Sequence, residues 1–214
     1  MPTTDTVGQE QKHVRAAYEA LATRHDLSAP LELPHRPDAI RLLALAPGQR
    51  VLDLACGTGL NFPGIVPALT AGGSLVGLDC TPGMLRRAAS RTERNGWHNV
   101  YLVLGDAKRL PFPDATFDRI ICSYALKIIP PYKEALDEAA RLLKQDGLFV
   151  VLDGKLSDGL SRFINPMAMW FARRACSDLR RPLIVENKRR FDDVCVHEYD
   201  HGHTFVAVAH SPLP

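Results

Sequence analysis

The chain has 214 residues, of which 46% are hydrophobic and 23% charged, as is usual for a soluble globular protein with a sizeable core. Its net charge of +2 provides no global electrostatic attraction toward nucleic acid. The five cysteines are scattered and form no CxxC pair, which favours a reduced, cytoplasmic chain.

The N-terminal part of the chain is predicted to be helical, over about 9–25 and 37–46. The first 20 residues contain no apolar core of the signal-peptide type. The 25 residues between Asp53 and Asp79 carry no charge and are long enough to cross a membrane. Glycine and proline interrupt them repeatedly, so we interpret this interval as a buried strand, turn, helix and strand.

Five short runs rich in Val, Ile and Leu predict strands that are covered on both faces of a sheet. These runs are 50–55, 74–79, 99–106, 117–123 and 147–153. Helical patterns lie between them. Thr81 and Pro82 begin a helix that stops at 95–96, and another runs over about 131–144 with its expected stop at 146–147.

This alternation predicts an α/β fold with a doubly wound, mostly parallel sheet of seven strands, of the Rossmann-like type. The last two strands are expected from the runs DVCVHEYD and TFVAVAHS, which the short link HGH joins into an antiparallel hairpin. We predict a single domain over 1–214. Its parts are a helical cap (1–46), a cofactor-binding core (47–155), an irregular insert (156–191) and the closing hairpin (192–214).

Three acidic residues, Asp53, Asp79 and Asp106, lie at the ends of the first three predicted strands. Ligands of an open parallel sheet bind beyond the carboxyl ends of its strands. Asp79, about 20 residues past a glycine turn, is placed to accept hydrogen bonds from ribose hydroxyls. Asp106 is placed to accept one from an exocyclic adenine amine. The three acids together predict an adenosine-containing ligand.

The glycine turn lies within VLDLACGTGLNFPG, residues 51–64, a pattern that nicotinamide, flavin and S-adenosylmethionine proteins share. A dinucleotide site requires GxGxxG to hold a pyrophosphate. Counting from Gly57, the third glycine would fall at Phe62. Asp53 would repel a pyrophosphate, whereas S-adenosylmethionine has no phosphate and carries a sulfonium and an ammonium. The pattern therefore favours S-adenosylmethionine, with S-adenosylhomocysteine as product.

Four motifs resemble those of the class I S-adenosylmethionine-dependent methyltransferases: VLDLACGTG, GLDCTPGMLRRA, GDAKRLPFPDATFDRIICSYAL and EAARLLKQDGLFVVLD. The likeness covers about 51–153 and is nearest to the branch of the ubiquinone/menaquinone C-methyltransferases and bacterial phosphatidylethanolamine N-methyltransferases. It implies a methionine site at Asp53, Ala55, Gly57 and Gly59, a ribose site at Asp79, an adenine site at Cys80, Met84, Asp106 and Ala107, and an active-site edge at Ser123. Asn61 completes the predicted cofactor set. Ala55 departs from the family, since many members carry glycine there.

The flanking segments also resemble this branch. YEALATRHD, residues 18–26, is similar to a YDxxAxxYD helix that closes over the cofactor, with Tyr18 retained and His25 in place of a tyrosine. The tail segments RFINPMAMWFARRACSDLRRPL and EYDHGHTFVAVAHS resemble the lipid N-methyltransferases more than the quinone enzymes.

Methyl transfer requires an aligned acceptor, the exclusion of water and, for some acceptors, the removal of a proton. It requires no covalent nucleophile. We predict catalytic roles for Tyr18, His25 and Tyr124, with Lys127 as a further candidate. For Tyr124 and Lys127, ordinary packing and surface roles remain open alternatives.

Residues 155–190 contain nine basic and three acidic residues beside several aromatic ones. One interpretation is a helix that lies on an anionic membrane surface or holds an acidic amphiphile. The other is a helix packed over the sheet with a solvated basic face. Either helix would serve as the acceptor lid. His197, His201 and His203 lie on the hairpin and its turn without a matching set of acids and cysteines, so we predict no metal site.

The sequence thus predicts a methyltransferase for a small-molecule or lipid acceptor, with N-methylation of an amine such as a phospholipid head group as the leading hypothesis. C-, O- or S-methylation of a quinone, phenol, thiol or other secondary metabolite is the alternative. A non-catalytic, cofactor-binding partner subunit is a rival of another class. Nucleic acid is disfavoured as acceptor because SYAL, not an NPPY-like tetrad, follows the fourth strand. The expected location is the cytoplasm, with peripheral membrane contact through the insert as an option, and no oligomeric state is predicted.

Overall fold

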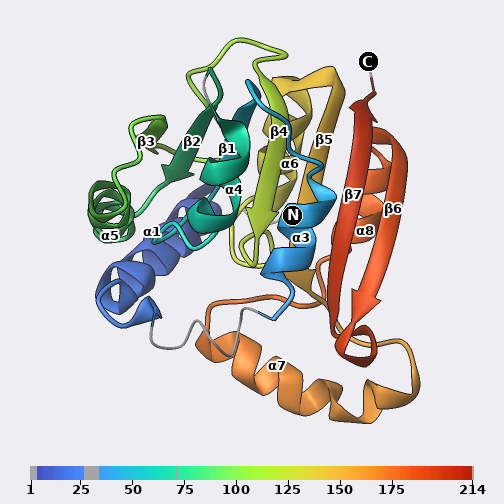
Figure 1. Ribbon diagram of the computed structural model, residues 1–214. Helices are drawn as coiled ribbons and strands as arrows, with labels where there is room; N and C mark the ends of the chain where they lie inside the picture. Colours follow the sequence, from blue (N-terminus) through green and yellow to red (C-terminus); the bar gives the residue numbers. More distant parts are fainter. Residues whose placement is uncertain (1–3, 27–33, 71, 214) are drawn as a thin grey trace.

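The computed structural model describes residues 4–26, 34–70 and 72–213. Its centre is a seven-stranded sheet in the order β3-β2-β1-β4-β5-β7-β6 (Figure 1). The strands are β1 (Arg50–Leu54), β2 (Ser74–Asp79), β3 (Val100–Leu104), β4 (Phe117–Ser123), β5 (Leu143–Gly154), β6 (Phe191–Tyr199) and β7 (Thr204–Pro212). The first five strands are parallel, and β7 pairs antiparallel with both β5 and β6. This confirms the predicted sheet and its hairpin.

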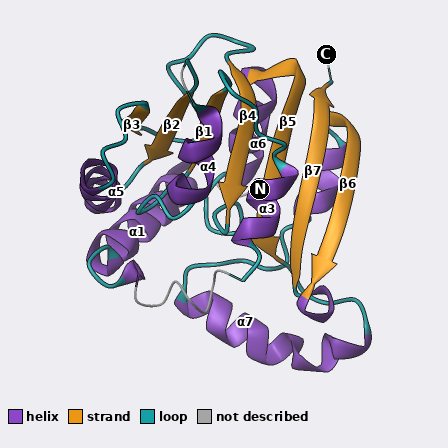
Figure 2. Ribbon diagram, viewed as in Figure 1, coloured by secondary structure: helices purple, strands orange, loops and turns teal. Residues whose placement is uncertain are grey.

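Helices cover both faces of the sheet (Figure 2). One face packs against α3 (Arg36–Leu42), α4 (Phe62–Leu69) and α5 (Pro82–Arg94), and the other against α6 (Tyr132–Leu142) and α8 (Leu183–Lys188). Neighbouring residues of one strand pack into different hydrophobic cores, one on each face of the sheet, because side chains alternate across a sheet. Val51 packs with Phe62 and Leu69 on one side, while Leu52 packs with Phe117 on the other.

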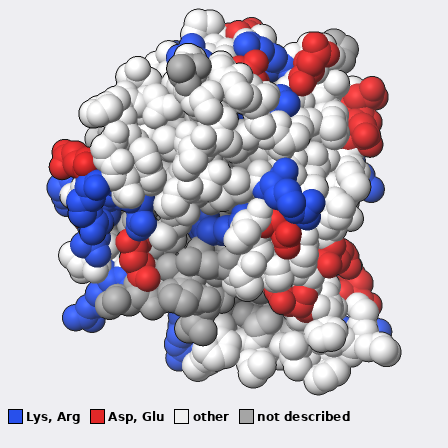
Figure 3. Space-filling view, in the orientation of Figure 1, with Lys and Arg blue, Asp and Glu red and all other residues white. Residues whose placement is uncertain are grey.

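Two helices lie across the carboxyl edge of the parallel strands. These are α1 (Thr4–Leu21), which contacts α5, and α7 (Asn165–Arg174), which follows a short 3₁₀ helix, η1 (Leu160–Ile164). A second 3₁₀ turn, η2 (Asp200–Gly202), links β6 to β7. No helix in the described part of the chain is both long and apolar enough to cross a membrane. Acidic and basic side chains are interspersed on the face shown in Figure 3.

Three local predictions were wrong. The helix expected over 131–144 ends at Leu142, and β5 begins at once with Leu143. Leu143 is buried opposite Phe117 of β4. Because Leu143 pairs with β4, the strand begins and the helix ends before the expected stop at 146–147. The insert, expected to be irregular, contains η1, α7 and α8. The third strand is also shorter than predicted, since it ends at Leu104 and leaves Asp106 in the following turn.

Candidate active site

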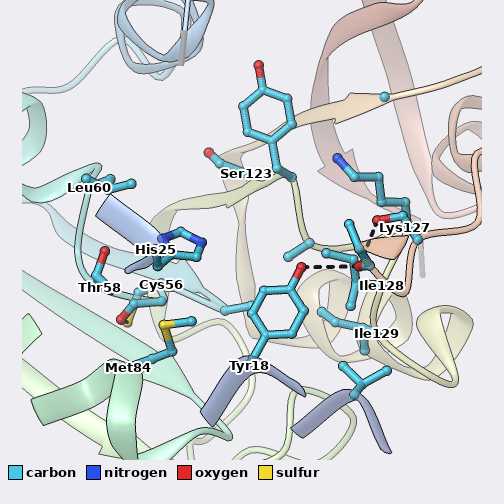
Figure 4. Close-up of a pocket in the computed structure, with 18 of the residues that line it drawn as sticks. Tyr18, His25, Cys56, Thr58, Leu60, Met84, Ser123, Lys127, Ile128 and Ile129 are labelled. Atoms are coloured by element: carbon cyan, nitrogen blue, oxygen red, sulfur yellow. Dashed lines mark hydrogen bonds between the residues drawn. The ribbon is translucent and has the colours of Figure 1, made fainter. Parts of the chain in front are cut away.

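A cavity of about 520 Å³ opens at the carboxyl edge of the sheet, under α1 and α7 (Figure 4). A neighbouring cavity of about 50 Å³ lies toward β3. Together they bring most of the predicted site residues to one place. The larger cavity is lined by Tyr18, His25, Ala55, Gly57, Asn61, Asp79, Cys80, Met84, Ser123 and Tyr124, and the smaller one by Cys80, Asp106 and Ala107. Asp53 and Gly59 line neither.

The turn after β1 has a backbone that favours glycine. Ala55, Gly57 and Gly59 all have positive φ angles, of 58°, 56° and 77°. A Cβ on Gly57 would meet no atom within 4 Å, whereas one on Gly59 would lie 2.6 Å from the ring of Phe62. Gly57 therefore presents open backbone to the cavity, and Gly59 allows close packing behind it. Ala55 adopts the left-handed conformation that the family glycine would adopt at lower cost.

Asp79 joins the ends of β1 and β2. Its carboxylate accepts hydrogen bonds from the Gly57 amide at 2.9 Å and from the Thr81 amide at 2.8 Å. Burial raises the pKa of this carboxyl, and the two amide donors partly oppose that rise. The acid is thus fixed on the cavity wall, where its remaining lone pairs can meet a ligand hydroxyl.

Asp53 is fully buried behind Asn61 rather than beside the cavity. The Asn61 amide Nδ2 donates to both carboxylate oxygens of Asp53, at 3.0 and 3.1 Å, and Arg36 Nη1 donates to Asn61 Oδ1 at 2.7 Å. Burial raises the pKa of Asp53 to about 7, and Asn61 and Arg36 oppose the rise. Asp53 therefore reaches the cavity through Asn61, and its role at the methionine end of the cofactor stays a prediction. No sequence pattern indicated Arg36.

Asp106 is held at the smaller cavity by a residue of α1. Gln11 Nε2 donates to Asp106 Oδ2 at 2.6 Å, and Lys108 Nζ lies 3.4 Å from the same oxygen. Gln11 also lines this cavity. No sequence pattern indicated Gln11, because its partner lies 95 residues away along the chain.

Two cations lie beside Tyr124, the residue that follows β4. Lys127 Nζ lies 4.6 Å and Arg36 Cζ 5.4 Å from the centroid of the Tyr124 ring, and all three residues line the cavity. Lys127 Nζ is paired at 3.0 Å with Asp153, a fully buried acid that also accepts the Lys127 and Gly154 amides. Asp153 thereby fixes the ammonium on the wall next to an aromatic ring.

Tyr18 and His25 approach the same cavity from the N-terminal side, with ring centroids 6.4 Å apart (Figure 4). The Tyr18 hydroxyl donates to the Ala175 carbonyl at 3.5 Å, which links α1 to the end of α7. His25 Nδ1 lies 3.8 Å from an Asp26 oxygen. The structure therefore places both predicted residues at the cavity, and their chemical roles remain predictions.

The described residues contain no cluster of His, Cys, Asp and Glu side chains that could hold a metal ion. The remaining features fit S-adenosylmethionine. Open backbone at Gly57, the Asn61 amide in front of the buried Asp53 and the Asp79 carboxylate lie at the larger cavity, and Asp106 lies at the smaller one. Their assignment to the methionine, ribose and adenine parts of the cofactor stays a prediction.

Comparison with known proteins agrees with this geometry. Residues 51–147 match a family model described as a methyltransferase domain. Demethylmenaquinone methyltransferase of Geobacillus stearothermophilus is 30% identical over 149 residues, covering 67% of this chain and 64% of the relative. The enzyme of the same name from Lysinibacillus sphaericus is 29% identical over 152 residues, covering 69% and 64%. The chain thus spans a little under two thirds of the length of these relatives.

Solved structures share the fold at low sequence identity. A methyltransferase solved in complex with the Trm112 methyltransferase activator of Haloferax volcanii superposes with a TM-score of 0.77 at 19% identity, covering 94% of this chain and 98% of that one. A SAM-dependent methyltransferase from Aquifex aeolicus gives 0.64 at 18% identity, covering 89% and 97%. The sheet order, the glycine turn with its acids and these likenesses lead to one conclusion: the chain belongs to the class I S-adenosylmethionine-dependent methyltransferases.

Proposed function

We propose that the protein is an enzyme that methylates a ring carbon of a phenolic acceptor of the quinol type. The observation that carries this proposal is the pair of cations, Lys127 and Arg36, beside the Tyr124 ring on the cavity wall. Stacking on tyrosine stabilises a bound aromatic acceptor. A fixed ammonium stabilises the phenolate oxygen of that acceptor in a site that excludes water. The names of the curated relatives also favour a quinone acceptor.

An amine acceptor, the leading hypothesis from the sequence, fits this wall less well. The Lys127 ammonium and the Arg36 guanidinium beside the Tyr124 ring offer no acceptor to an ammonium, which must also lose its proton before its nitrogen can attack. A phenol that loses its proton becomes an anion and is attracted by the same cations. The names of the curated relatives favour the quinone alternative over the amine, and the cationic donors of Lys127 and Arg36 beside Tyr124 support the same choice.

The chemistry needs few protein groups. When bound, S-adenosylmethionine supplies an electrophilic methyl group on positively charged sulfur. Lys127 holds the phenolate oxygen, whose electron pair drives the ortho carbon to form the new C–C bond as the S–C bond breaks. The ring carbon then loses its proton and the ring regains aromaticity. We propose that the His25 imidazole receives the protons of the acceptor one after the other and passes each to solvent, while Tyr18 lies beside it in the cavity wall.

An acceptor panel tests this function. Purified protein is incubated with methyl-labelled S-adenosylmethionine and a demethylated naphthoquinol, simple phenols or phosphatidylethanolamine, and the product's mass and methyl position are determined. We expect one methyl group on a quinol ring carbon. Methylation of phosphatidylethanolamine with no quinol product would overturn the proposal, as would the absence of any product from a protein that binds S-adenosylhomocysteine.

Substitution of Lys127 tests the role of the cation. Lys127→Met alone leaves Asp153 buried and unpaired, which threatens the fold, so the informative variant is Lys127→Met/Asp153→Asn. We expect kcat for the quinol to fall about 100-fold, the size of losing one oxyanion donor, with unchanged binding of S-adenosylhomocysteine. The pH optimum should move upward, because the phenol must ionise without help. Lys127→Arg should retain part of the activity, and Lys144→Met, on the surface, serves as the matched control.

A further inference from the structure

The segment formed by η1 and α7 is apolar on two sides. One side faces the cavity, with Ala168, Phe171, Ala172 and Ala175 among the lining residues. The other side carries Leu160, Phe163, Met167 and Trp170, which we call the outer ridge. These four residues are 98%, 77%, 56% and 52% exposed. Leu160 and Phe163 are three residues apart in η1, and Met167 and Trp170 are three residues apart in α7, so each pair lies on one side of its helix.

The outer ridge lacks the cover that such a surface requires. No residue of η1 or α7 is fully buried, and Figure 3 shows the surface of α7, along the lower edge of the molecule, as largely uncharged. A contiguous exposed apolar patch marks a site of contact with a partner or a membrane.

The charges around the outer ridge identify the kind of partner. Residues 159–175 contain three arginines, Arg162, Arg173 and Arg174, all exposed, and no acid. The Arg174 guanidinium lies 3.4 Å from the Trp170 ring centroid, so an aromatic ring and a cation share one site. Asp158 precedes the segment and lies 3.5 Å from Lys155. Arginine beside tryptophan on an apolar ridge is the composition of an interfacial helix on anionic lipid.

We propose that the outer ridge docks the protein on an anionic lipid bilayer, with its four apolar side chains at the boundary between head groups and acyl chains and the three arginines on lipid phosphates. A second copy of the chain fits less well, because two-fold packing of this ridge on itself would bring like charges together. Docking does not depend on the proposed function. If that function holds, the bilayer contact brings an apolar acceptor to the helix whose other side lines the cavity.

The hydrogen bonds that hold α7 to the rest of the protein lie at its two ends. At its start, Asn165 exchanges two hydrogen bonds with the backbone of Ser157, at 3.0 and 3.1 Å. Beyond its end, the Ser177 amide donates to the Ala172 carbonyl at 2.8 Å and the Asp178 amide to the Lys127 carbonyl at 2.9 Å. These contacts use polar groups at the two ends of α7 and leave the outer ridge free to face lipid.

Vesicle binding tests the proposal without cofactor or acceptor, so its failure is distinct from failure of the methyltransferase function. The protein is co-sedimented with vesicles of phosphatidylcholine alone or mixed with phosphatidylglycerol, at low and high salt. We expect binding to the anionic vesicles that weakens with salt. Trp97→Phe leaves Trp170 as the only tryptophan, and its emission should shift to the blue on binding.

Two variants locate the contact. Phe163→Ser/Trp170→Ala should weaken binding about tenfold or more, since each side chain contributes substantial apolar burial, whereas the equally exposed pair Tyr101→Ser/Leu104→Ala on β3 should not. Arg173→Glu/Arg174→Glu should abolish the preference for anionic lipid, in contrast to Arg94→Glu/Lys188→Glu. Equal binding by ridge and control variants would refute docking, as would a dimer in light scattering that only the ridge variants dissociate.

Discussion

Asp53 combines full burial with a position behind the cavity wall, so its charge responds to what the cavity holds. Its pKa of about 7 in the ligand-free protein, against a reference of 3.8, reflects burial above all. An acid whose pKa is raised by folding favours the folded state in its protonated form, so its contribution to stability declines as the pH rises from about 4 to 7. A bound cation reverses this preference, because it lowers the pKa.

Binding of S-adenosylmethionine at pH 7 is therefore expected to release up to about half a proton per molecule, and its affinity should increase from pH 6 to pH 8. Calorimetry at one pH in two buffers of different ionisation enthalpy measures the release. Asp53→Asn, which keeps an acceptor for the Asn61 amide, should remove most of it. S-adenosylhomocysteine, which lacks the sulfonium, should release less. A binding enthalpy independent of buffer for the unsubstituted protein would contradict the assignment.

At the scale of elements, acidic residues of α1 and of the segment just after it bind α5 and the glycine turn. Glu19 accepts the Gly83 amide at 2.7 Å at the start of α5. Asp26 accepts from Thr58 Oγ1 at 2.5 Å and from Arg91 Nη2 at 2.7 Å. Arg91 Nε also donates to the Thr58 carbonyl of the glycine turn. These hydrogen bonds connect α1 and Asp26, which cover the cavity, with α5 and the glycine turn.

Asp26→Ala should break this connection and weaken the binding of S-adenosylhomocysteine about tenfold, the equivalent of about 1.4 kcal/mol. The matched control is Asp38→Ala, which removes an exposed i,i+3 pair with Arg41 and should leave binding unchanged. Titration calorimetry gives both affinities. An equal loss in the two variants would show that the effect is general and does not come from the cover.

At the scale of the whole molecule, stability should be uneven. Most residues of β1, β4 and β5 are buried, whereas α7 contains no buried residue. In hydrogen exchange, we expect amides of these strands to exchange only on global unfolding and those of α7 to exchange by local opening. Adding S-adenosylhomocysteine should slow exchange in α1 and the glycine turn and leave β6 unchanged. Uniform protection of α7 and β4 would contradict this expectation.

Much of this architecture was predictable from local patterns. Runs of Val, Ile and Leu indicated the strands, and because parallel strands end at one edge, Asp79 and Asp106 could be placed at one site from their sequence positions alone. Local sequence patterns do not predict which side chains from distant parts of the chain come into contact. Three contacts depend on how helices pack over the sheet. They are the burial of Asp53 behind Asn61, the hydrogen bond from Gln11 to Asp106 and the contact of Arg36 with Tyr124.

The position of β7 has a consequence for how the chain is made. Strand β6 pairs within the described residues only with β7, and β7 lies between it and β5. During synthesis β6 leaves the ribosome first, but it has no place in the sheet until β7 follows. Until then the edge of β5 is open to other chains. We therefore expect the cofactor half of the nascent protein to assemble before the last two strands join the sheet, and to be exposed in that form to chaperones and neighbouring polysomes.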